Sequence, residues 1–516
     1  MKKLLYITII ATISLLLGCK DFLEGSSQDL VIVKDATHLN EVLLGSGYLQ
    51  SKEIRNILGG EVAPWLNYMD DDINTVVGPT GRINDYTLMS AIYGYTTWQY
   101  EVGRSYDKNS LNPDDMTWKK LYTNINILNV ILNELERIMA ESTVESDKTL
   151  ALTIEGEAKF LRAHFYFLLV NLYADAYVPS KAASTLGVPL KLTHYVEYNK
   201  DEQVKFERTN VAAVYEQLVK DLTESIACFT ESPQTKKLYR ANKASAQILL
   251  SRVYLYMQDW ENSRKVAEAY TSENSYIENM SAYGNETVFF TEENQEIVFS
   301  QGSLICQNNT TASAGDFCIT KDLYELYDEN DYRLNTYFQR NVQTDSIVIA
   351  KFRKNLHISY VSDIFSMRTS EAFLNLAEAC AMLGDASAAH SALDKLLVNR
   401  IENYVPSMET GNELIDKVRT ERRKELVFEG HRWFDLRRYA VNEKHPFKKD
   451  ILRVYAVYGR DASTTFSHVE KYLLPAGDPA YTLQIPASVT EYDSDMPTNP
   501  RFQRKPIETE EENNQP

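Results

Sequence analysis

A helical pattern of apolar residues runs through the middle of this 516-residue chain and constrains its fold more than any other feature. Between residues 118 and 139, apolar side chains recur at the i, i+3, i+4 and i+7 spacing that places them on one face of a helix. Similar patterns cover residues 155–173, 212–229 and 243–257. We therefore expect a mostly α protein. The first stripe consists of Leu121, Ile125, Leu128, Ile131, Leu132 and Leu135.

Two stretches of the chain repeat the order helix, short turn, helix. The run AQILLSRVYLYMQDWENSRKVAEAY turns at Gln258-Asp259, and the run EAFLNLAEACAMLGDASAAHSALDKLL turns at Gly384-Asp385. A small residue after the turn lets paired helices approach closely, as tetratricopeptide-like hairpins require. Such repeats predict stacked helical pairs. The small residues are Ala267, Ala388 and Ala389.

The length allows one large domain, which we place at residues 36–505. Within it we expect helical repeats at about residues 117–270 and 368–440. Residues 271–365 carry strand-like runs (ETVFF, EIVFS and SIVIAKF) between polar loops, so we expect an irregular, loop-rich part with minor β structure there. The acidic tail at 506–516 is predicted to be disordered.

The N-terminus has the composition of an export signal. Lys2 and Lys3 precede an apolar run over residues 4–17, which is too short to cross a hydrocarbon core of about 30 Å as a helix. The run ends in Leu-Leu-Gly-Cys, which resembles the lipobox of bacterial lipoproteins. Gly18 leaves room for a signal peptidase, and Cys19 supplies the thiol that is acylated.

From this pattern we predict a signal peptide at residues 1–18 and a lipidated tether at residues 19–35. The alternative is an uncleaved anchor helix with an incidental cysteine, and the place of Cys19 directly behind the apolar run argues against it. Acyl chains on Cys19 would hold the protein on a membrane without a transmembrane helix.

Charge and cysteine content limit the remaining functions. A net charge of −18 and the lack of a Lys/Arg block argue against a nucleic-acid partner. Cys228 and Cys380 lie in helical patterns and are expected in the core. Cys306 and Cys318 flank a polar loop, where export would permit a disulfide, and no cysteine has zinc-site spacing.

Aromatic residues are the candidates for ligand binding. They lie in EVAPWLNYMDDD and AIYGYTTWQYEVG. Flat rings stack on the C–H faces of sugars while neighbouring polar side chains take the hydroxyls. The alternative is that the rings fix a loop onto the helical core. The candidates are Trp65, Tyr68, Tyr93, Tyr95, Trp98 and Tyr100.

Two charged motifs invite a chemical interpretation. In ERRKELVFEGHRWFDLRR, we interpret Glu421, Glu425 and Arg432 as a structural ion-pair network around Trp433, because Glu429 and His431 would not share a helix face. The chain has no HExxH, GxSxG or P-loop spacing, and we predict no catalytic residues, no cofactor and no metal. A carboxylate pair for glycoside cleavage could still be distant in sequence.

The second motif, the triad at residues 70–72, has three consecutive aspartates and Asn74 two residues later. It lacks the glycine and glutamate of an EF-hand loop. We expect a solvated turn there, with a loose Ca²⁺ site as the weaker alternative.

Several longer segments together resemble the SusD/RagB family. They are EGEAKFLRAHFYFLLVNLYADA, RTNVAAVYEQLVKDLTESI, YRANKASAQILLSRVYLYMQDW, RTSEAFLNLAEACAMLGD and TERRKELVFEGHRWFDLRRY. The resemblance covers nearly the whole mature chain in the family's order. It departs at the end, where Arg501 replaces the usual glycine after Asn499-Pro500.

The resemblance implies a SusD-like fold and a lipid-anchored protein on the outer face of the outer membrane. It implies binding of an oligosaccharide, or in some members a peptide, and delivery to a SusC-like TonB-dependent transporter. In the family, ligand loops also come from the region that here contains Asn308, Asn309 and Phe317. A surface hydrolase and a purely structural lipoprotein remain the alternatives.

Overall fold

The computed structural model describes most of the chain beyond the N-terminal segment. The described residues are 33, 35–49, 62–75, 86–111, 114–195, 206–233, 238–284, 287–301, 317–338, 361–362, 364–459 and 466–511. The predicted signal peptide and Cys19 lie outside them, as does the tether apart from residues 33 and 35. Cys306, Asn308 and Asn309 also lie outside.

Helices form the larger part of the described chain, which confirms the expected mostly α class. The helices of eight or more residues are α3 (Tyr86–Thr96), α4 (Met116–Glu141), α5 (Glu145–Tyr173), α6 (Val211–Glu231), α7 (Lys243–Met257), α8 (Trp260–Glu273), α11 (Thr369–Leu383), α12 (Ala386–Leu397), α13 (Gly411–Glu425) and α14 (Arg432–Ala440). The shorter α-helices are α2 (Ala36–Val42), α9 (Lys321–Tyr324), α10 (Tyr332–Tyr337) and α15 (Ala487–Tyr492).

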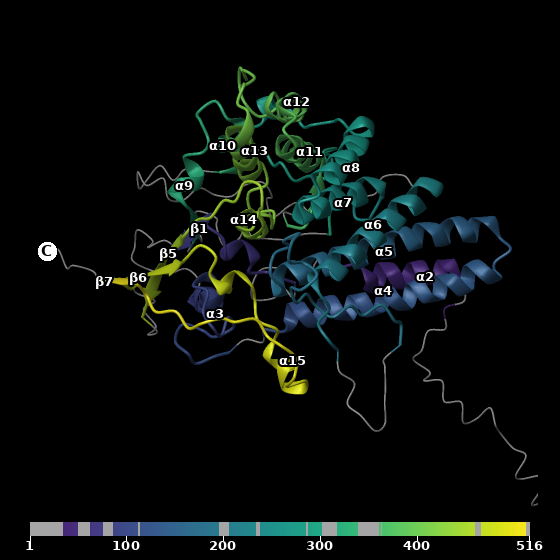
Figure 1. Ribbon diagram of the computed structural model, residues 1–516, viewed down its shortest axis with the longest axis horizontal. Coiled ribbons are helices and arrows are strands. Elements are labelled where there is room, and N and C mark those ends of the chain that lie inside the picture. Colours follow the sequence, from purple (N-terminus) through teal and green to yellow (C-terminus); the bar gives the residue numbers. More distant parts are fainter. Residues whose placement is uncertain are drawn as a thin grey trace, which may run out of the picture.

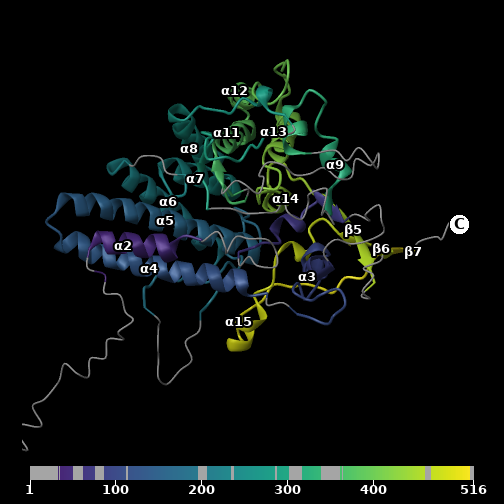
Figure 2. The same cartoon turned by 180° about the vertical axis from the view of Figure 1, so that it is seen from behind.

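The long helices α4, α5 and α6 lie side by side at one end of the molecule (Figures 1 and 2). The predicted stripe of α4 faces inward, since Leu121, Ile125 and Leu128 are buried. Helix α5 is buried almost all round in its second half because α4, α6 and α2 surround it. The sequence predicted one apolar face for both helices; α4 has it, whereas α5 is buried nearly all round in its second half.

The two predicted hairpins have the same turn. Gln258 and Gly384 end the first helix of each pair in the left-handed region, at φ +61° and +85°. The aspartate that follows each of them caps the second helix by accepting a hydrogen bond from a backbone N–H. Helix α11 packs on both α7 and α8, and Ala267 and Ala389 are fully buried at the contacts. The predicted stacked helical repeats are confirmed.

The strands lie mostly at the opposite end from the long helices. Strands β5 (Ile451–Tyr458) and β6 (Phe466–Leu474) form an antiparallel hairpin, and β7 (Glu508–Glu511) pairs with β6. Two further antiparallel pairs are short. They join β1 (Ile73–Thr75) to β3 (Phe317–Ile319) and β2 (Ile297–Phe299) to β4 (Met367–Arg368).

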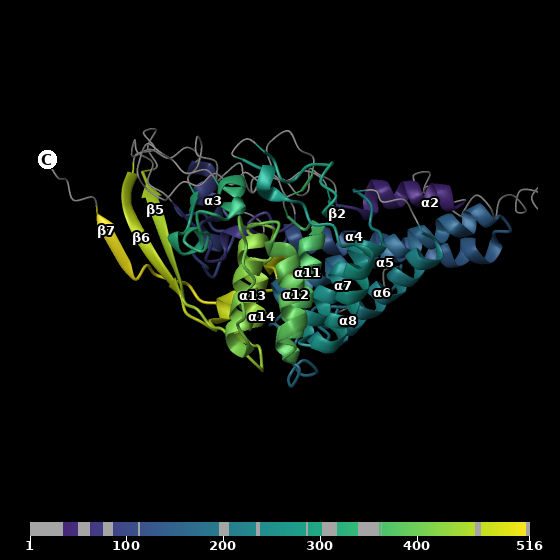
Figure 3. The ribbon, with the colours of Figure 1, turned by 90° about the horizontal axis from the view of Figure 1, so that it is seen from above.

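Two expectations need correction. The tail is not disordered at Glu508–Glu511, because β7 extends the sheet and Lys471 forms ion pairs with Glu508 and Glu510. The expected minor β structure appears at EIVFS, as β2, but ETVFF is not a strand in its described residues. Figure 3 shows the three-stranded sheet at one end, α11–α14 in the middle and α4–α8 at the other end. The β5–β6 hairpin was not predicted.

Candidate ligand-binding site

Most of the predicted ligand-binding aromatics are core residues. Trp98 is 0% exposed, and its indole N–H donates to the Met69 carbonyl at 2.9 Å. The guanidinium of Arg453 lies 5.4 Å from the centre of its ring. Trp98 has φ +55°, so this contact holds the backbone in the left-handed region. The ring fixes the loop after α3 to the loop before β1 and has no face open to a ligand.

Trp65 and Tyr95 stack on each other with ring centres 4.4 Å apart, and both are buried. Tyr68 meets Phe317 edge to face at 4.8 Å, beside the β1–β3 pair. These four rings are covered by one another and by the core, so direct stacking on a sugar is not available to them in this structure. The alternative given above, rings that fix loops to the core, describes them.

Tyr93 belongs to a cluster of tyrosines between α3 and the β5–β6 hairpin. Its ring packs edge to face on Tyr106 and Tyr455, and its hydroxyl lies 2.9 Å from that of Tyr472. The Tyr472 hydroxyl donates to Glu470 at 2.6 Å. Burial, followed by the nearby carboxylate of Glu470, raises the pKa of the Tyr106 hydroxyl. Neutral phenols thus attach the hairpin to α3.

Tyr100 differs from the other candidates because 49% of its surface is exposed. It lines a cavity of about 480 Å³ together with Asp114, Gln484 and Ser488. This volume lies within the range of roughly 300–1,000 Å³ that is usual for ligand pockets. A ring, two kinds of hydrogen-bond acceptor and a hydroxyl meet there, which is the chemistry that a sugar needs. Among the described residues, Tyr100 is the predicted aromatic best placed to touch a ligand.

Contacts between distant segments build this cavity. The Asp115 carboxylate accepts a 2.8 Å hydrogen bond from the Ser488 hydroxyl, which joins α15 to the start of α4. Arg501 donates from Nε to the Gln99 carbonyl at 2.7 Å and so fixes the residue before Tyr100. A Cβ atom at position 94, in α3, would lie 2.3 Å from the carbonyl oxygen of Val102, which is part of the cavity wall. Glycine is therefore needed for this part of the wall to pack against α3.

The cavity is acidic. Burial raises the pKa of the Asp114 carboxyl, and the neighbouring charges of Asp115 and Glu491 raise it further, although backbone hydrogen bonds oppose them. Glu101, also in the wall, is paired with Arg104 at 2.9 Å. Carboxylates accept hydrogen bonds from hydroxyl groups but repel anionic ligands. The site therefore suits a neutral polyhydroxylated ligand.

Sequence reasoning found Tyr100 but missed Asp114, Gln484 and Ser488. The last two lie in LQIPASVTEYDSDMPTNPR, close to 400 positions further along the chain. No periodicity links them to Tyr100. Only the family resemblance of that segment could have drawn attention to it.

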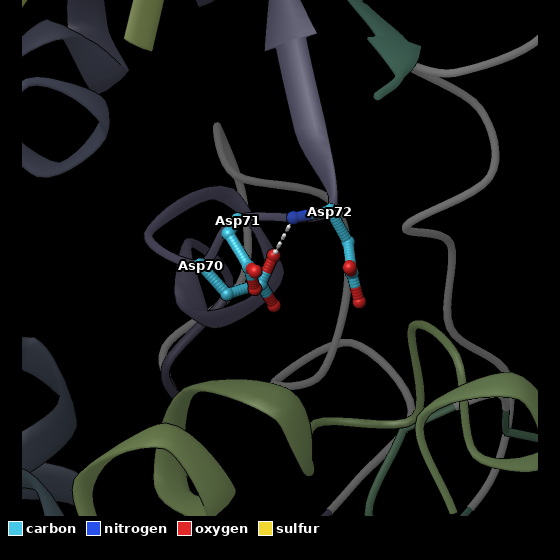
Figure 4. A group of neighbouring side chains, drawn as sticks. All are labelled: Asp70, Asp71 and Asp72. Carbon is cyan, nitrogen blue, oxygen red and sulfur yellow. Dashed lines mark hydrogen bonds between the residues drawn. The ribbon is translucent and has the colours of Figure 1, made fainter. Parts of the chain in front are cut away.

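The aspartate triad is buried, so the expected solvated turn is wrong. Asp71 binds Arg432 at 2.7 Å and Lys449 at 2.8 Å, and Arg423 binds Asp72 at 2.7 Å. The Asp70 carboxylate accepts from the Asp72 backbone N–H at 2.9 Å (Figure 4).

Oxygen atoms of the three carboxylates come within 4.8 Å of one another, as a cation would require. However, burial and the two neighbouring aspartates raise the pKa of Asp70, while Arg432 and Arg423 outweigh burial at Asp71 and lower its pKa. The cations already compensate much of the charge that would attract Ca²⁺. We therefore interpret the triad as structural.

The charged motif of α13 is structural as predicted. The Glu425 carboxylate contacts three buried guanidinium groups, those of Arg368 at 2.5 Å, Arg400 at 2.9 Å and Arg333 at 3.2 Å. Glu421 pairs with Arg333 at 2.7 Å. Arg432, which was assigned to the same network, instead pairs with Asp71. All these groups are buried, so they are not accessible to a substrate.

The structure also bears on the cysteines and on membrane-spanning helices. Cys228, Cys318 and Cys380 are buried and have free thiols, and the first and last lie in helices as expected. Within the described ranges, no helix combines the length and the apolar character needed to cross a membrane.

Two family models match the chain in sequence order. The model described as starch-binding associating with outer membrane matches residues 66–255, and the model described as the SusD family matches residues 337–502. A search of curated protein sequences finds no significant match.

Solved structures with the same fold include a SusD-like carbohydrate binding protein from Bacteroides vulgatus, with 19% identity, TM-score 0.66, and coverage of 90% of this chain and 98% of that one. A putative sugar binding protein from the same species has 22% identity, TM-score 0.66, and coverage of 91% and 99%. A laminarin binding SusD-like protein has 18% identity, TM-score 0.59, and coverage of 91% and 100%.

Proposed function

Because this chain belongs to the SusD family, we propose that it captures an oligosaccharide at the bacterial surface without cleaving it and delivers it to a SusC-like TonB-dependent transporter. The observation that carries the proposal is the match of two family models, in order, across residues 66–255 and 337–502. The acidic cavity at Tyr100 supports it, since a ring beside hydroxyl and carboxylate groups suits a neutral sugar.

A glycan fits better than a peptide, which is the second candidate. Peptide ligands that add to a sheet need a strand edge, and none of the described residues that line the cavity at Tyr100 belongs to a strand. The cavity at Tyr100 instead offers side-chain acceptors. The names of similar structures point the same way, with carbohydrate, sugar and laminarin as the ligands of those proteins.

The protein acts at the outer face of the outer membrane, where acyl chains on Cys19 hold it. Support comes from the Leu-Leu-Gly-Cys sequence and from the description of the first family model, which names association with the outer membrane. A Cys19→Ala variant should lose the lipid and leave the membrane fraction, as mass spectrometry and fractionation would show. Retention of the variant in the membrane would contradict this anchor.

Binding is tested by calorimetry on the chain from residue 20 onward. The ligands are laminarihexaose, maltohexaose, cellohexaose and a mixture of short peptides. We expect at least one hexaose to bind, and Tyr100→Ala to weaken it about tenfold or more, equivalent to about 1.4 kcal/mol. Tyr195→Ala is the matched control, because Tyr195 is similarly exposed but does not line the cavity. Binding of peptides alone would favour the second candidate.

The non-catalytic role is tested on the same samples. After long incubation with each hexaose, chromatography should show only intact ligand. Shorter products that disappear in Asp114→Asn would instead support the surface hydrolase. Delivery is tested by affinity purification from the native membrane, where we expect a TonB-dependent barrel to accompany the protein.

A further inference from the structure

The wall of the cavity at Tyr100 carries negative charge that its own side chains do not balance. Three carboxylates line the cavity, those of Glu101, Asp114 and Asp115. None of the described residues in the wall is a lysine, an arginine or a histidine. Glu101 pairs with Arg104, outside the wall, at 2.9 Å. The charges of Asp114 and Asp115 therefore border the cavity without a cationic side chain beside them in its wall.

This arrangement differs from that of several other buried carboxylates of the protein, which are paired with guanidinium groups. Asp221, for example, binds Arg162 at 2.6 Å. Such pairing is the usual condition for removing a charge from water. Asp114 is half-buried, and burial followed by the like charges of Asp115 and Glu491 raises the pKa of its carboxyl. A cation in the cavity would relieve this repulsion.

The fold holds both carboxylates in place. Asp115 precedes α4, whose N-terminus favours negative charge, and it accepts the hydrogen bond from Ser488. The charge of Asp115 therefore has a structural reason. Asp114 accepts backbone hydrogen bonds, one of them from Ala487 at the start of α15. A neutral asparagine could accept the same bonds, so packing alone does not account for the charge at position 114.

The same cavity offers apolar contacts. Tyr100 is 49% exposed, and Leu111, also in the wall, is 53% exposed. A ring and an aliphatic side chain suit the C–H faces of a sugar, and a tyrosine ring also attracts a cation near its face. A neutral sugar would use the apolar surfaces and the acceptors but would leave the charge uncompensated. A simple inorganic cation would leave the apolar surfaces unused.

We propose that this cavity prefers saccharides with a protonated amine, such as glucosamine units, over neutral sugars of the same linkage, and that Asp114 sets this preference. The inference rests on the proposed function, because it concerns the same site. Charges attract more strongly in a partly buried cavity than in bulk water, since the effective dielectric constant is lower there. An N-acetyl group removes the positive charge of the amine, and a uronate reverses its sign, so sugars with either group should bind less tightly.

The test is calorimetry with the β-1,4-linked hexamer of glucosamine and with cellohexaose. The two ligands share their linkage and differ only in the amine or hydroxyl at each C2. At about pH 6 most of the amines carry a proton. We expect the wild type to bind the glucosamine hexamer about tenfold or more tighter than cellohexaose. Asp114→Asn should lose most of this difference, whereas Tyr100→Ala should weaken the binding of both ligands.

Glu261→Gln in α8 is the matched control. It removes the same charge from an exposed residue that does not line the cavity. The preference should persist in this variant, which separates the cavity from general attraction to a protein with a net charge of −18. The melting temperature of Asp114→Asn should not fall, because the change removes a carboxylate that burial and like charges disfavour.

Other outcomes separate the two proposals. Equal binding of the two hexamers, or tighter binding of cellohexaose, would overturn the preference and leave the proposed function standing. Binding of laminarihexaose or maltohexaose alone would have the same meaning. A preference that Asp114→Asn and Glu261→Gln reduce equally would be non-specific attraction and would also overturn it. If no saccharide bound at all, both proposals would fall.

Discussion

The helical repeats differ from the sheet β5–β7 and the loops at Thr96 and Gln99 in the range of the contacts that hold each together. We call this second region the loop-rich part from here on. In the repeats, α7 and α8 or α11 and α12 pack as neighbours in sequence, and each turn is capped by the residue beside it. In the loop-rich part, Arg453 donates to the Thr96 carbonyl at 3.1 Å and Arg501 to that of Gln99. Those partners are more than 350 positions apart.

This difference teaches where stability and specificity are set. Local helices depend on apolar periodicity, which many sequences can satisfy. The loops depend on single arginines that each bind several carbonyl groups, such as Arg453 with Thr96, Tyr68 and Asp70. Ion pairs such as Arg432 with Asp71 connect the two parts. We expect the loops to respond more sharply to the loss of one ring than the repeats do to the loss of one apolar side chain, and both parts to respond to the loss of a buried charge.

Low pH should change the free energy of unfolding more than any of the substitutions below. Burial alone would raise the pKa of Glu425, Glu378 and Asp435, but the arginines around them lower it below the ordinary value. Groups with a lowered pKa stabilise the fold above the unfolded pKa, about 4, and lose that contribution as pH falls through the folded pKa. We expect the free energy of unfolding to fall steeply below about pH 4.

Urea titration at a series of pH values measures this effect. Near-constant stability from neutral pH down to the acid end of the range would show that the ion pairs contribute little. Circular dichroism would also show whether helical and tertiary signals fall together, as expected because Glu378 and Glu425 lie in the repeat helices α11 and α13.

Glu425→Ala should give the next largest effect, a loss of about 5 kcal/mol in the free energy of unfolding. The change leaves Arg333, Arg368 and Arg400 buried with less compensating charge. Denaturant unfolding measures the loss. Glu268→Ala is the control, because its partner Arg264 is partly exposed and such pairs contribute about 0–1 kcal/mol. Equal effects of the two changes would refute the argument.

Trp98→Ala should cost about 4 kcal/mol, because it removes a fully buried ring and leaves a cavity. The indole hydrogen bond to Met69 is lost as well. Thermal unfolding measures the cost, and Leu128→Ala in α4 is the comparison within the repeats. Loss of ligand binding with unchanged stability would mean that Trp98 contacts ligand after all.

Lys471→Ala should have the smallest effect on the free energy of unfolding, because solvent screens its pairs with the half-exposed Glu508 and Glu510. The change should loosen β7 without affecting the hairpin. Hydrogen exchange of the Glu508–Glu511 amides would rise while that of β5 stays unchanged. Uniform exchange across the sheet would contradict an independent edge strand.

The sequence predicted the repeats well because their signal is local. The stripe at Leu121–Leu135 and the turns at Gln258 and Gly384 are visible without any tertiary contact. The structural role of Glu425 was also predicted, although its three arginine partners were not. The β5–β6 hairpin was missed even though ILRVYAVY is rich in β-forming residues.

The ligand candidates were harder to judge because a ring that binds sugar and a ring that fills a core look alike in sequence. Tyr100 and Trp98 are two positions apart, yet one is half exposed and the other completely buried. Which of them faces outward depends on Met69 and Arg453. The partners Gln484 and Ser488 depend on how α15 meets α4, which no local pattern specifies.

The described chain enters its fold near α2 and leaves it at β7, and Figure 1 shows these elements at opposite ends of the longest axis. A fluorophore joined at Glu511 would therefore lie far from α2. Its distance from the attachment surface would change as the whole body tilts. The strand pairing of β7 would limit local motion of the dye, so its signal would report rigid-body motion of the whole protein.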